Sequence, residues 1–334
     1  MRKRRLHRRE RKRCRNIIVF SICLVFLGLS IGYAAFSTGI VMNAKGNVKE
    51  MTASQLLKTK VVTSGEGLYK DYTEEGRYVY RGTNPDNYLN LGNDMYRIIA
   101  VEKDNTLKMV KNESIGKFQY DTIGSRYEEN TYCGNSSLGC DWWCNRNDTL
   151  NENLQNISYV QNFSNTDTLV LPSQSSSINK YLNEEYILTL NSKYIEKHIF
   201  NIGYVGDRNG DANISLIDAI KTEKLYKWQG YVGLINVSDY MKATLDSCKY
   251  IHDNNCGNSN YLNDKKVWAT INTAINNYEK DFGTSIRYTN GKGSFNMLGC
   301  NPNYEYEIYP VFFLSSNISL KGYGTENRPY VIVK

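Results

Sequence analysis

The stretch that decides the predicted fold is YRIIAVEKDNTLKMV, residues 96–110. Its first part, Tyr96–Val101, is a β-prone apolar run, and its last part, Thr106–Val110, alternates apolar and polar side chains. Between them lie the turn-forming polar residues Lys103–Asn105. Two β-prone runs around a polar turn predict an antiparallel hairpin.

Outward from this hairpin, the chain holds further β-prone runs and a few helical patterns. Strands are expected at 78–80, 231–235, 311–314 and 330–333, and helices at 53–60, 176–199 and 266–282. The pattern for the second helix is apolar residues at helical spacing, with serines at 175–177 able to cap its start: Ile178, Leu182, Tyr186 and Leu190. Many strands with a few inserted helices indicate an α+β fold with a mostly antiparallel sheet.

The charges divide the chain into a basic terminus and a nearly neutral remainder. Residues 2–15 contain ten Lys or Arg and one acid, Glu10, a local charge of +9. Of 41 basic and 34 acidic residues overall, 31 and 33 remain, for a net charge of −2. An uncharged apolar segment at 17–36 follows the basic terminus and is long enough for one bilayer crossing. The basic residues before it are expected to stay in the cytoplasm.

These features predict a basic cytoplasmic segment at 1–16, a transmembrane helix or signal anchor at 17–36, a stalk with a short helix at 37–75 and a globular extracellular domain at 76–334. The alternative for the apolar segment is a cleaved signal peptide, because Gly32-Tyr33-Ala34 offers small residues at the usual cleavage spacing. The protein would then be secreted. A basic arm can also bind nucleic acid, but the adjoining apolar segment favours the membrane as partner, and we expect no nucleic-acid partner.

Cysteine usage agrees with export. Of eight cysteines, six lie beyond the apolar segment, and an even number in an oxidising compartment predicts disulfides: Cys133, Cys140, Cys144, Cys248, Cys256 and Cys300. We expect Cys248 and Cys256 to close a small loop, because turn-forming residues lie between them. The other four would form two bonds within a polar excursion at 121–170 and between it and Cys300. Zinc binding is the alternative, but the spacing of the first three cysteines does not match paired zinc ligands.

Several separate motifs, in the same order, resemble those of a family of exported and membrane-anchored surface proteins of low-GC Gram-positive bacteria. The resemblance covers most of residues 50–334 and is carried by Gly67–Asp71, Glu75–Gly82, Asn84–Tyr88, Tyr96–Ile99, Lys108–Gly116, Trp228–Leu234, Ser238–Tyr240, Pro310–Leu314, Ser316–Ile318 and Gly324–Tyr330. It implies a bacterial cell-surface protein.

The closing pattern is similar to that of C-type-lectin and formylglycine-generating-enzyme domains, which implies a C-type-lectin-like ectodomain. Such domains carry Gly, Arg and Pro before the last apolar run, whereas the equivalent here, Ile308-Tyr309-Pro310, lacks the Arg. No cysteine stands at a recognisable position for formylglycine-generating activity, so that activity is not implied.

Motifs for established enzyme chemistries are missing from the sequence. It contains no nucleophile elbow, phosphate loop or paired metal-binding histidines. His198 is expected on a helix as a packed or surface residue, and His252 is expected to be solvated in the loop between Cys248 and Cys256. We therefore predict no catalytic residues, with an exported enzyme of unrecognised type as the alternative.

Binding to an extracellular protein or glycan is the favoured function. The chain has 27 tyrosines, and a tyrosine offers an apolar ring with a hydroxyl that suits such surfaces, although it also fills β-sheet cores. The candidate binding residues are Trp142, Trp143, Trp228 and Tyr231.

One loop is a candidate calcium site. Residues 206–218 resemble the calcium loops of dockerin and EF-hand modules, and the oxygen ligands would come from Asp207, Asn209, Asp211, Asn213, Ser215 and Asp218. Ala212 stands where such loops use Gly for the sharp turn. A solvated turn without metal is the alternative, and no other cofactor is expected.

Overall fold

The computed structural model describes residues 21, 23–25, 50–121, 176–203, 205, 214–224, 227–263, 266–273, 286–289, 293–295 and 304–333. The chain divides into two units, Met1–Glu50 and Met51–Lys334. In the described part of the chain, no helix is both long and apolar enough to span a bilayer. Most of the predicted anchor at 17–36 lies outside the described residues.

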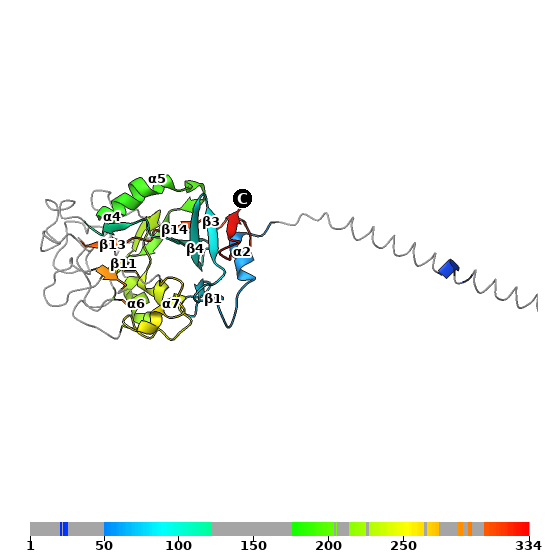
Figure 1. The fold of residues 1–334 in the computed structure, drawn as a ribbon, viewed down its shortest axis with the longest axis horizontal. Helices are drawn as coiled ribbons and strands as arrows, with labels where there is room; N and C mark the ends of the chain where they lie inside the picture. Colours follow the sequence, from blue (N-terminus) through cyan, green and yellow to red (C-terminus); the bar gives the residue numbers. More distant parts are fainter. Residues whose placement is uncertain are drawn as a thin grey trace, which may run out of the picture. The chain divides into compact units, whose positions relative to one another are not determined.

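The second unit is a mixed α+β fold built on one large sheet, which confirms the predicted class (Figure 1). The sheet runs β10-β14-β5-β4-β3-β16-β15, with β2 also on β4, β1 on β2 and β7 on β14. All these pairs are antiparallel except β16 with β3. The strands are β1 (Gly67–Lys70), β2 (Tyr78–Arg81), β3 (Tyr88–Leu91), β4 (Asp94–Val101), β5 (Leu107–Lys111), β7 (Ile195–Glu196), β10 (Val232–Gly233), β14 (Val311–Leu314), β15 (Leu320–Lys321) and β16 (Tyr330–Ile332).

Smaller elements surround this sheet. Three two-stranded sheets pair β6 (Lys117–Gln119) with β13 (Glu305–Glu307), β8 (His198–Asn201) with β9 (Lys227–Gly230), and β11 (Ala269–Thr273) with β12 (Ile286–Tyr288). The helices and helical turns are α2 (Ala53–Lys58), α4 (Ser177–Lys180), η3 (Tyr181–Tyr186), α5 (Ile187–Thr189), η4 (Ser192–Tyr194), α6 (Leu216–Glu223), α7 (Val237–Ala243) and η5 (Asn254–Gly257). In the view of Figure 1, α4 and α5 lie above the strands, and α6 and α7 lie below them.

The predicted hairpin is the centre of the sheet. Strands β4 and β5 pair antiparallel, and the turn between them places Asn105 at φ 71°, a left-handed conformation that Asn tolerates better than most residues. Alternation along a strand sends Lys108 toward one face of the sheet and its neighbour Met109 toward the other. Lys108 reaches α7 on its face, so the hairpin supplies a charged group to that side.

Three other sequence expectations differ from the structure. The helix predicted at 176–199 starts correctly, with Ser176 as its cap, but ends at Thr189. Residues 195–201 instead form β7 and β8, because the strands β14 and β9 supply partners for their backbone groups. The helix predicted at 266–282 is wrong where it is described, since Ala269–Thr273 is a strand. The predicted strand at 231–235 is reduced to Val232–Gly233.

The compact unit begins at Met51 rather than at residue 76. Helix α2 starts with a capping box formed by Thr52 and Gln55, and Leu57 is fully buried in the core. Ala53 is fixed by a hydrogen bond from its N–H to the carbonyl of Ile318, 2.7 Å away. Thus the short helix expected in a stalk belongs to the folded domain.

This packing predicts that Leu57→Ala destabilises the domain by about 2–5 kcal/mol, because it removes a fully buried side chain. Leu56→Ala is the matched control, since Leu56 is only partly buried beside the core and should cost clearly less. Urea unfolding of both full-length variants measures the difference. Equal midpoints for the two would contradict the assignment of α2 to the domain.

Candidate functional site

The candidate site is a pocket of about 270 Å³ on the α7 side of the sheet. We call it the charged pocket. Its lining residues come from the segment before β2, from the turn after β4, from β5, β8, β9 and β14, and from α6, α7 and the residues beside them: Glu74, Arg77, Glu102, Lys108, His198, Ile199, Asn201, Ile220, Glu223, Lys224, Lys227, Asn236, Ser238, Asp239, Lys242 and Phe313.

Helix α7 organises this pocket although it has only seven residues, all of them buried. Asn236 precedes the helix and donates from Nδ2 to the carbonyl of Asn201, at 2.7 Å. The N–H of Val237 donates to Oδ1 of Asn272, at 3.0 Å. With its first turn fixed by these amides, α7 presents Asp239 and Lys242 on one face, because residues three apart on a helix are neighbours.

Buried ion pairs connect that face to the sheet. Arg77 contacts three carboxylates: Nη1 lies 2.8 Å from Asp71, Nε 2.9 Å from Glu102 and Nη2 2.8 Å from Asp239. Asp239 also accepts from Lys108, at 2.6 Å. The side chains of Arg77 and Asp239 are 5% and 4% exposed, so this cluster is withdrawn from water.

The cluster has a second branch at Asp71, which accepts from Lys242 at 2.7 Å in addition to Arg77. We call the six residues the ion cluster: Asp71, Arg77, Glu102, Lys108, Asp239 and Lys242. Three bases face three acids, so the buried charges compensate one another. Compensation of this kind is required, since an unpaired buried charge is strongly unfavourable.

The charged partners control the ionisation of the two buried aspartates. Burial alone would favour the neutral form of Asp71, but Lys242 and Arg77 lower its pKa to about 2. Burial opposes ionisation of Asp239 as well, and Lys108 and Arg77 outweigh it and hold its pKa well below the usual range. Both groups are therefore ionised at neutral pH.

Glu223, at the end of α6, behaves in the opposite way. It is 2% exposed and accepts two hydrogen bonds from Ser238, from the N–H at 2.9 Å and from Oγ at 2.5 Å. Burial raises its pKa to about 7, although the bonds from Ser238 favour the ionised form. The nearby charge of Asp239 acts in the same direction as burial and contributes to this shift. The pocket thus contains one carboxyl group that titrates near neutral pH.

His198 lies at the edge of the pocket on β8, not on a helix as predicted. Its Nε2 is 3.0 Å from Oδ2 of Asp104, and its ring stacks on Phe313 with centroids 3.7 Å apart. The hydrogen bond to His198 is the main reason why the pKa of Asp104 is lowered. The histidine therefore fixes the turn of the central hairpin against β14.

Neither of the two sequence-predicted binding residues that the structure describes, Trp228 and Tyr231, lines this pocket. Trp228 is 6% exposed and packs against Phe200, with ring centroids 5.5 Å apart. Tyr231 is 38% exposed, and the ammonium of Lys197 lies 5.5 Å from its ring. Trp142 and Trp143 lie outside the described residues. Of these two described residues, Trp228 on β9 is buried, and Tyr231, between β9 and β10, has a partly exposed ring.

Most of the candidate calcium loop also lies outside the described residues, including Asp207, Asn209, Asp211 and Asn213. Ser215 and Asp218 are described and start α6. Ser215 Oγ accepts from the N–H of Asp218 at 3.2 Å and donates to its Oδ2 at 2.6 Å. This is a helix cap. The part of the chain that the structure describes holds no cluster of three metal-binding side chains.

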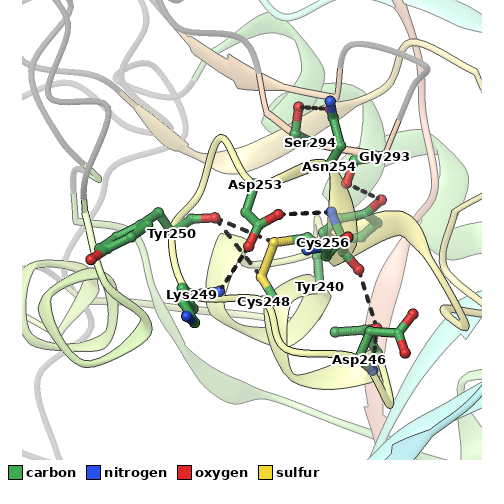
Figure 2. The surroundings of a disulfide bond; sticks show 12 residues. Tyr240, Asp246, Cys248, Lys249, Tyr250, Asp253, Asn254, Cys256, Gly293 and Ser294 are labelled. Carbon is green, nitrogen blue, oxygen red and sulfur yellow. Dashed lines mark hydrogen bonds between the residues drawn. A yellow bond between two sulfur atoms is a disulfide. The ribbon is translucent and has the colours of Figure 1, made fainter.

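The predicted disulfide between Cys248 and Cys256 is confirmed (Figure 2). Asp253 lies inside the loop that this disulfide closes. Its carboxylate accepts hydrogen bonds from the N–H groups of Lys249 and Asn255, at 3.3 and 2.9 Å. His252 is half-buried rather than solvated, with Nδ1 3.0 Å from the carbonyl oxygen of Phe295. The other four cysteines predicted to form disulfides, Cys133, Cys140, Cys144 and Cys300, lie outside the described residues.

Sequence reasoning missed the ion cluster altogether. Arg77 and Asp239 are 162 residues apart, and neither residue lies in a motif with a known chemical role. The available signal was weak: both lie in stretches on which the family resemblance rests, and Asp239 and Lys242 have helical spacing in a largely apolar segment. Only the fold brings them to one place.

Removing the carboxylate of Asp239 should show how much the ion cluster contributes to the free energy of unfolding. Asp239→Asn leaves Arg77 and Lys108 without a shared buried counter-charge, and we expect a loss of about 3–5 kcal/mol in the free energy of unfolding. The control is Asp94→Asn, which breaks the ion pair between Asp94 and Lys111. Because the Asp94 side chain is 51% exposed, this substitution should cost at most about 1 kcal/mol. Urea unfolding checks both. A loss at Asp239 no larger than at Asp94 would contradict the role of the cluster.

The raised pKa of Glu223 predicts a pH-dependent stability. Because the folded state holds this proton more tightly than the unfolded state, its contribution to stability falls as pH rises from about 4.5 through about 7. Glu223→Gln, which mimics the protonated carboxyl, should lack that fall. Thermal unfolding of both proteins between about pH 5 and about pH 8 measures it. Parallel profiles would show that Glu223 does not titrate in this range.

The chain was compared with protein-family models, curated proteins and solved structures, and none of them matches. The geometry of the charged pocket, together with the confirmed disulfide, is therefore the basis on which a function can be argued.

Proposed function

We propose that the protein is a membrane-anchored, extracellular surface protein whose ectodomain binds a glycan through the charged pocket. Residues 1–16 would stay in the cytoplasm and residues 17–36 would anchor the chain, or be removed on secretion. The disulfide between Cys248 and Cys256 supports export, because disulfides persist in oxidising compartments and are rare in the cytosol.

The observation that carries the proposal is a concave site whose polar groups are already fixed and whose charges are largely compensated. The buried carboxylates accept hydrogen bonds, and amide and ammonium groups such as those of Asn201 and Lys227 donate them. A neutral ligand with many hydroxyl groups can satisfy both kinds of partner. Fixed groups lose little freedom on binding, which favours affinity.

A protein ligand, the other ligand class expected from the sequence, is less well supported by this pocket. Its volume of about 270 Å³ suits one or two small polar units rather than a large interface.

The C-type-lectin-like character implied by the family resemblance remains part of the proposal. The mostly antiparallel α+β fold is compatible with it.

An enzyme is the second candidate, and one observation favours it. Glu223 is a buried carboxyl group with a pKa near 7 that lines a pocket, and such groups serve as general acids or bases. Both its oxygens, however, accept hydrogen bonds from Ser238. This engagement is better suited to a structural group, so binding is the function that we favour.

A glycan and protein array probed with the full-length protein tests the binding function. Lys227→Ala should weaken the binding of glycan hits by about tenfold, the loss expected when a charged hydrogen-bond donor is removed. Lys321→Ala, an exposed lysine on β15 away from the pocket lining, is the control and should bind normally. Glycans whose affinity is unchanged by both substitutions would place binding outside the charged pocket. The absence of any glycan hit would overturn the proposal.

The proposed topology has its own test. Protease added to intact cells should degrade residues 50–334, because the basic terminus holds the chain with its C-terminal part outside. Detection with an antibody to the ectodomain follows the loss. Survival of the domain on intact cells, with degradation only after lysis, would contradict the orientation.

A further inference from the structure

A second pocket, of about 200 Å³, lies on the other side of Lys242, beside the disulfide. We call it the disulfide pocket. Val79, Leu216 and Met241 contribute buried apolar surface to it. Its charged lining residues are Lys70, Asp71, Arg81, Lys242 and Asp246, and Tyr72 and Cys248 also line it.

The two pockets differ in how their charges are paired. In the charged pocket, Arg77, Lys108 and Lys242 all contact carboxylates. In the disulfide pocket, by contrast, Lys70 and Arg81 form no ion pair with any residue that the structure describes.

One unpaired acid opposes these two bases. Asp246 is exposed, and its carboxylate likewise has no ion pair among the described residues. Since Lys242 and Asp71 compensate each other, the unpaired groups sum to one positive charge. The disulfide pocket therefore favours an anionic group.

Arg81 is held ready for such a group. Its Nε donates to the carbonyl of Thr244 at 2.9 Å, and its guanidinium carbon lies 5.0 Å from the ring centroid of Tyr69. These contacts fix the plane of the side chain and use only one of its five N–H donors. The terminal nitrogens of a guanidinium match a carboxylate or sulfate with two parallel hydrogen bonds.

An aromatic ring adjoins the cations. Tyr72 is 75% exposed, and its phenol is close enough to Arg81 for that charge to oppose the rise of its pKa caused by burial. An exposed ring next to an anion site suits a saccharide, because the apolar face of a sugar ring packs on an aromatic face. A free inorganic anion would make no use of this ring.

The disulfide holds one wall of the pocket. Residues 246–248 form that wall. Cys248 is bonded to the fully buried Cys256, and the N–H of Asp246 donates to Oγ1 of Thr244 at 3.0 Å. Figure 2 shows the loop folded around this bond, with Asp246 and Cys248 on the same stretch. Loss of the disulfide would release the wall that faces Arg81.

We propose that the disulfide pocket binds the carboxylate or sulfate group of an acidic glycan, with Arg81 and Lys70 as its anion ligands and Tyr72 as the stacking surface for the sugar ring. The proposal deepens the glycan-binding function and rests on it. It adds the prediction that the ligand class is acidic.

The test uses the full-length protein and a panel of carboxylated and sulfated oligosaccharides, each beside its methyl-esterified or desulfated counterpart. Acidic members should bind at least about tenfold more tightly than their neutral counterparts, and the difference should shrink as salt is raised. Lys70→Gln and Arg81→Lys should each reduce the preference, the latter because it keeps the charge but loses the planar fork.

Two controls separate this proposal from neighbouring explanations. Lys321→Gln, an exposed lysine outside both pocket linings, should keep both the affinity and the preference for acidic members. The double variant Cys248→Ser/Cys256→Ser should reduce the preference. Sodium sulfate alone should compete only weakly. Competition as strong as that of the acidic glycans would reduce the site to a general anion site and refute the glycan assignment.

The remaining outcomes also decide the matter. Glycans that bind with no preference for the acidic members would overturn the disulfide-pocket proposal and leave the proposed function intact. A preference that survives both Lys70→Gln and Arg81→Lys would place the anion elsewhere and overturn it as well. If no glycan of either kind binds, the proposed function fails together with this inference.

Discussion

The salt bridges of Asp239 to Arg77 and Lys108 are the interactions on which the described domain depends most. One carboxylate on a short helix joins the segment before β2 to the central hairpin. Helix α7 has too few residues to be stable alone. Its position is set by contacts made from outside it, and its complete burial leaves no water to replace a missing partner.

The same cluster explains why two adjacent pockets have different electrostatic character. Lys242 lines both pockets and is neutralised by Asp71. On one side of this pair, Arg77 and Lys108 are held in further ion pairs, and Glu223 has a pKa raised to about 7. On the other side, Arg81 and Lys70 have no ion-pair partner among the described residues. Two pockets that share one buried ion pair can therefore differ in the ligands that they favour, because the other charges around each pocket differ.

Opposite pKa shifts in Asp239 and Glu223 follow from their partners, since both are buried carboxyl groups. Asp239 faces two cations, which outweigh the cost of burial. Glu223 contacts no cation in a described ion pair. The hydrogen bonds from Ser238 and the charge of Lys108 lower its pKa, but burial, together with the charge of Asp239, outweighs them. Groups of similar exposure thus differ in charge because of which side chains the fold places beside them.

Local pattern determined much of the sheet and little of the sites. The hairpin at 96–110, the strand at Val311–Leu314, the start of the helix at Ser177 and the loop between Cys248 and Cys256 depend on neighbours in sequence, and the sequence by itself determined them. Residues 195–201 and 269–273 have patterns that a helix could also use, and the tertiary structure made them strands by supplying partner strands. The ion cluster and both pockets were decided by the tertiary structure alone. Their charged side chains come from segments far apart in the chain, and no periodicity of one segment can encode which distant charge will meet it after folding.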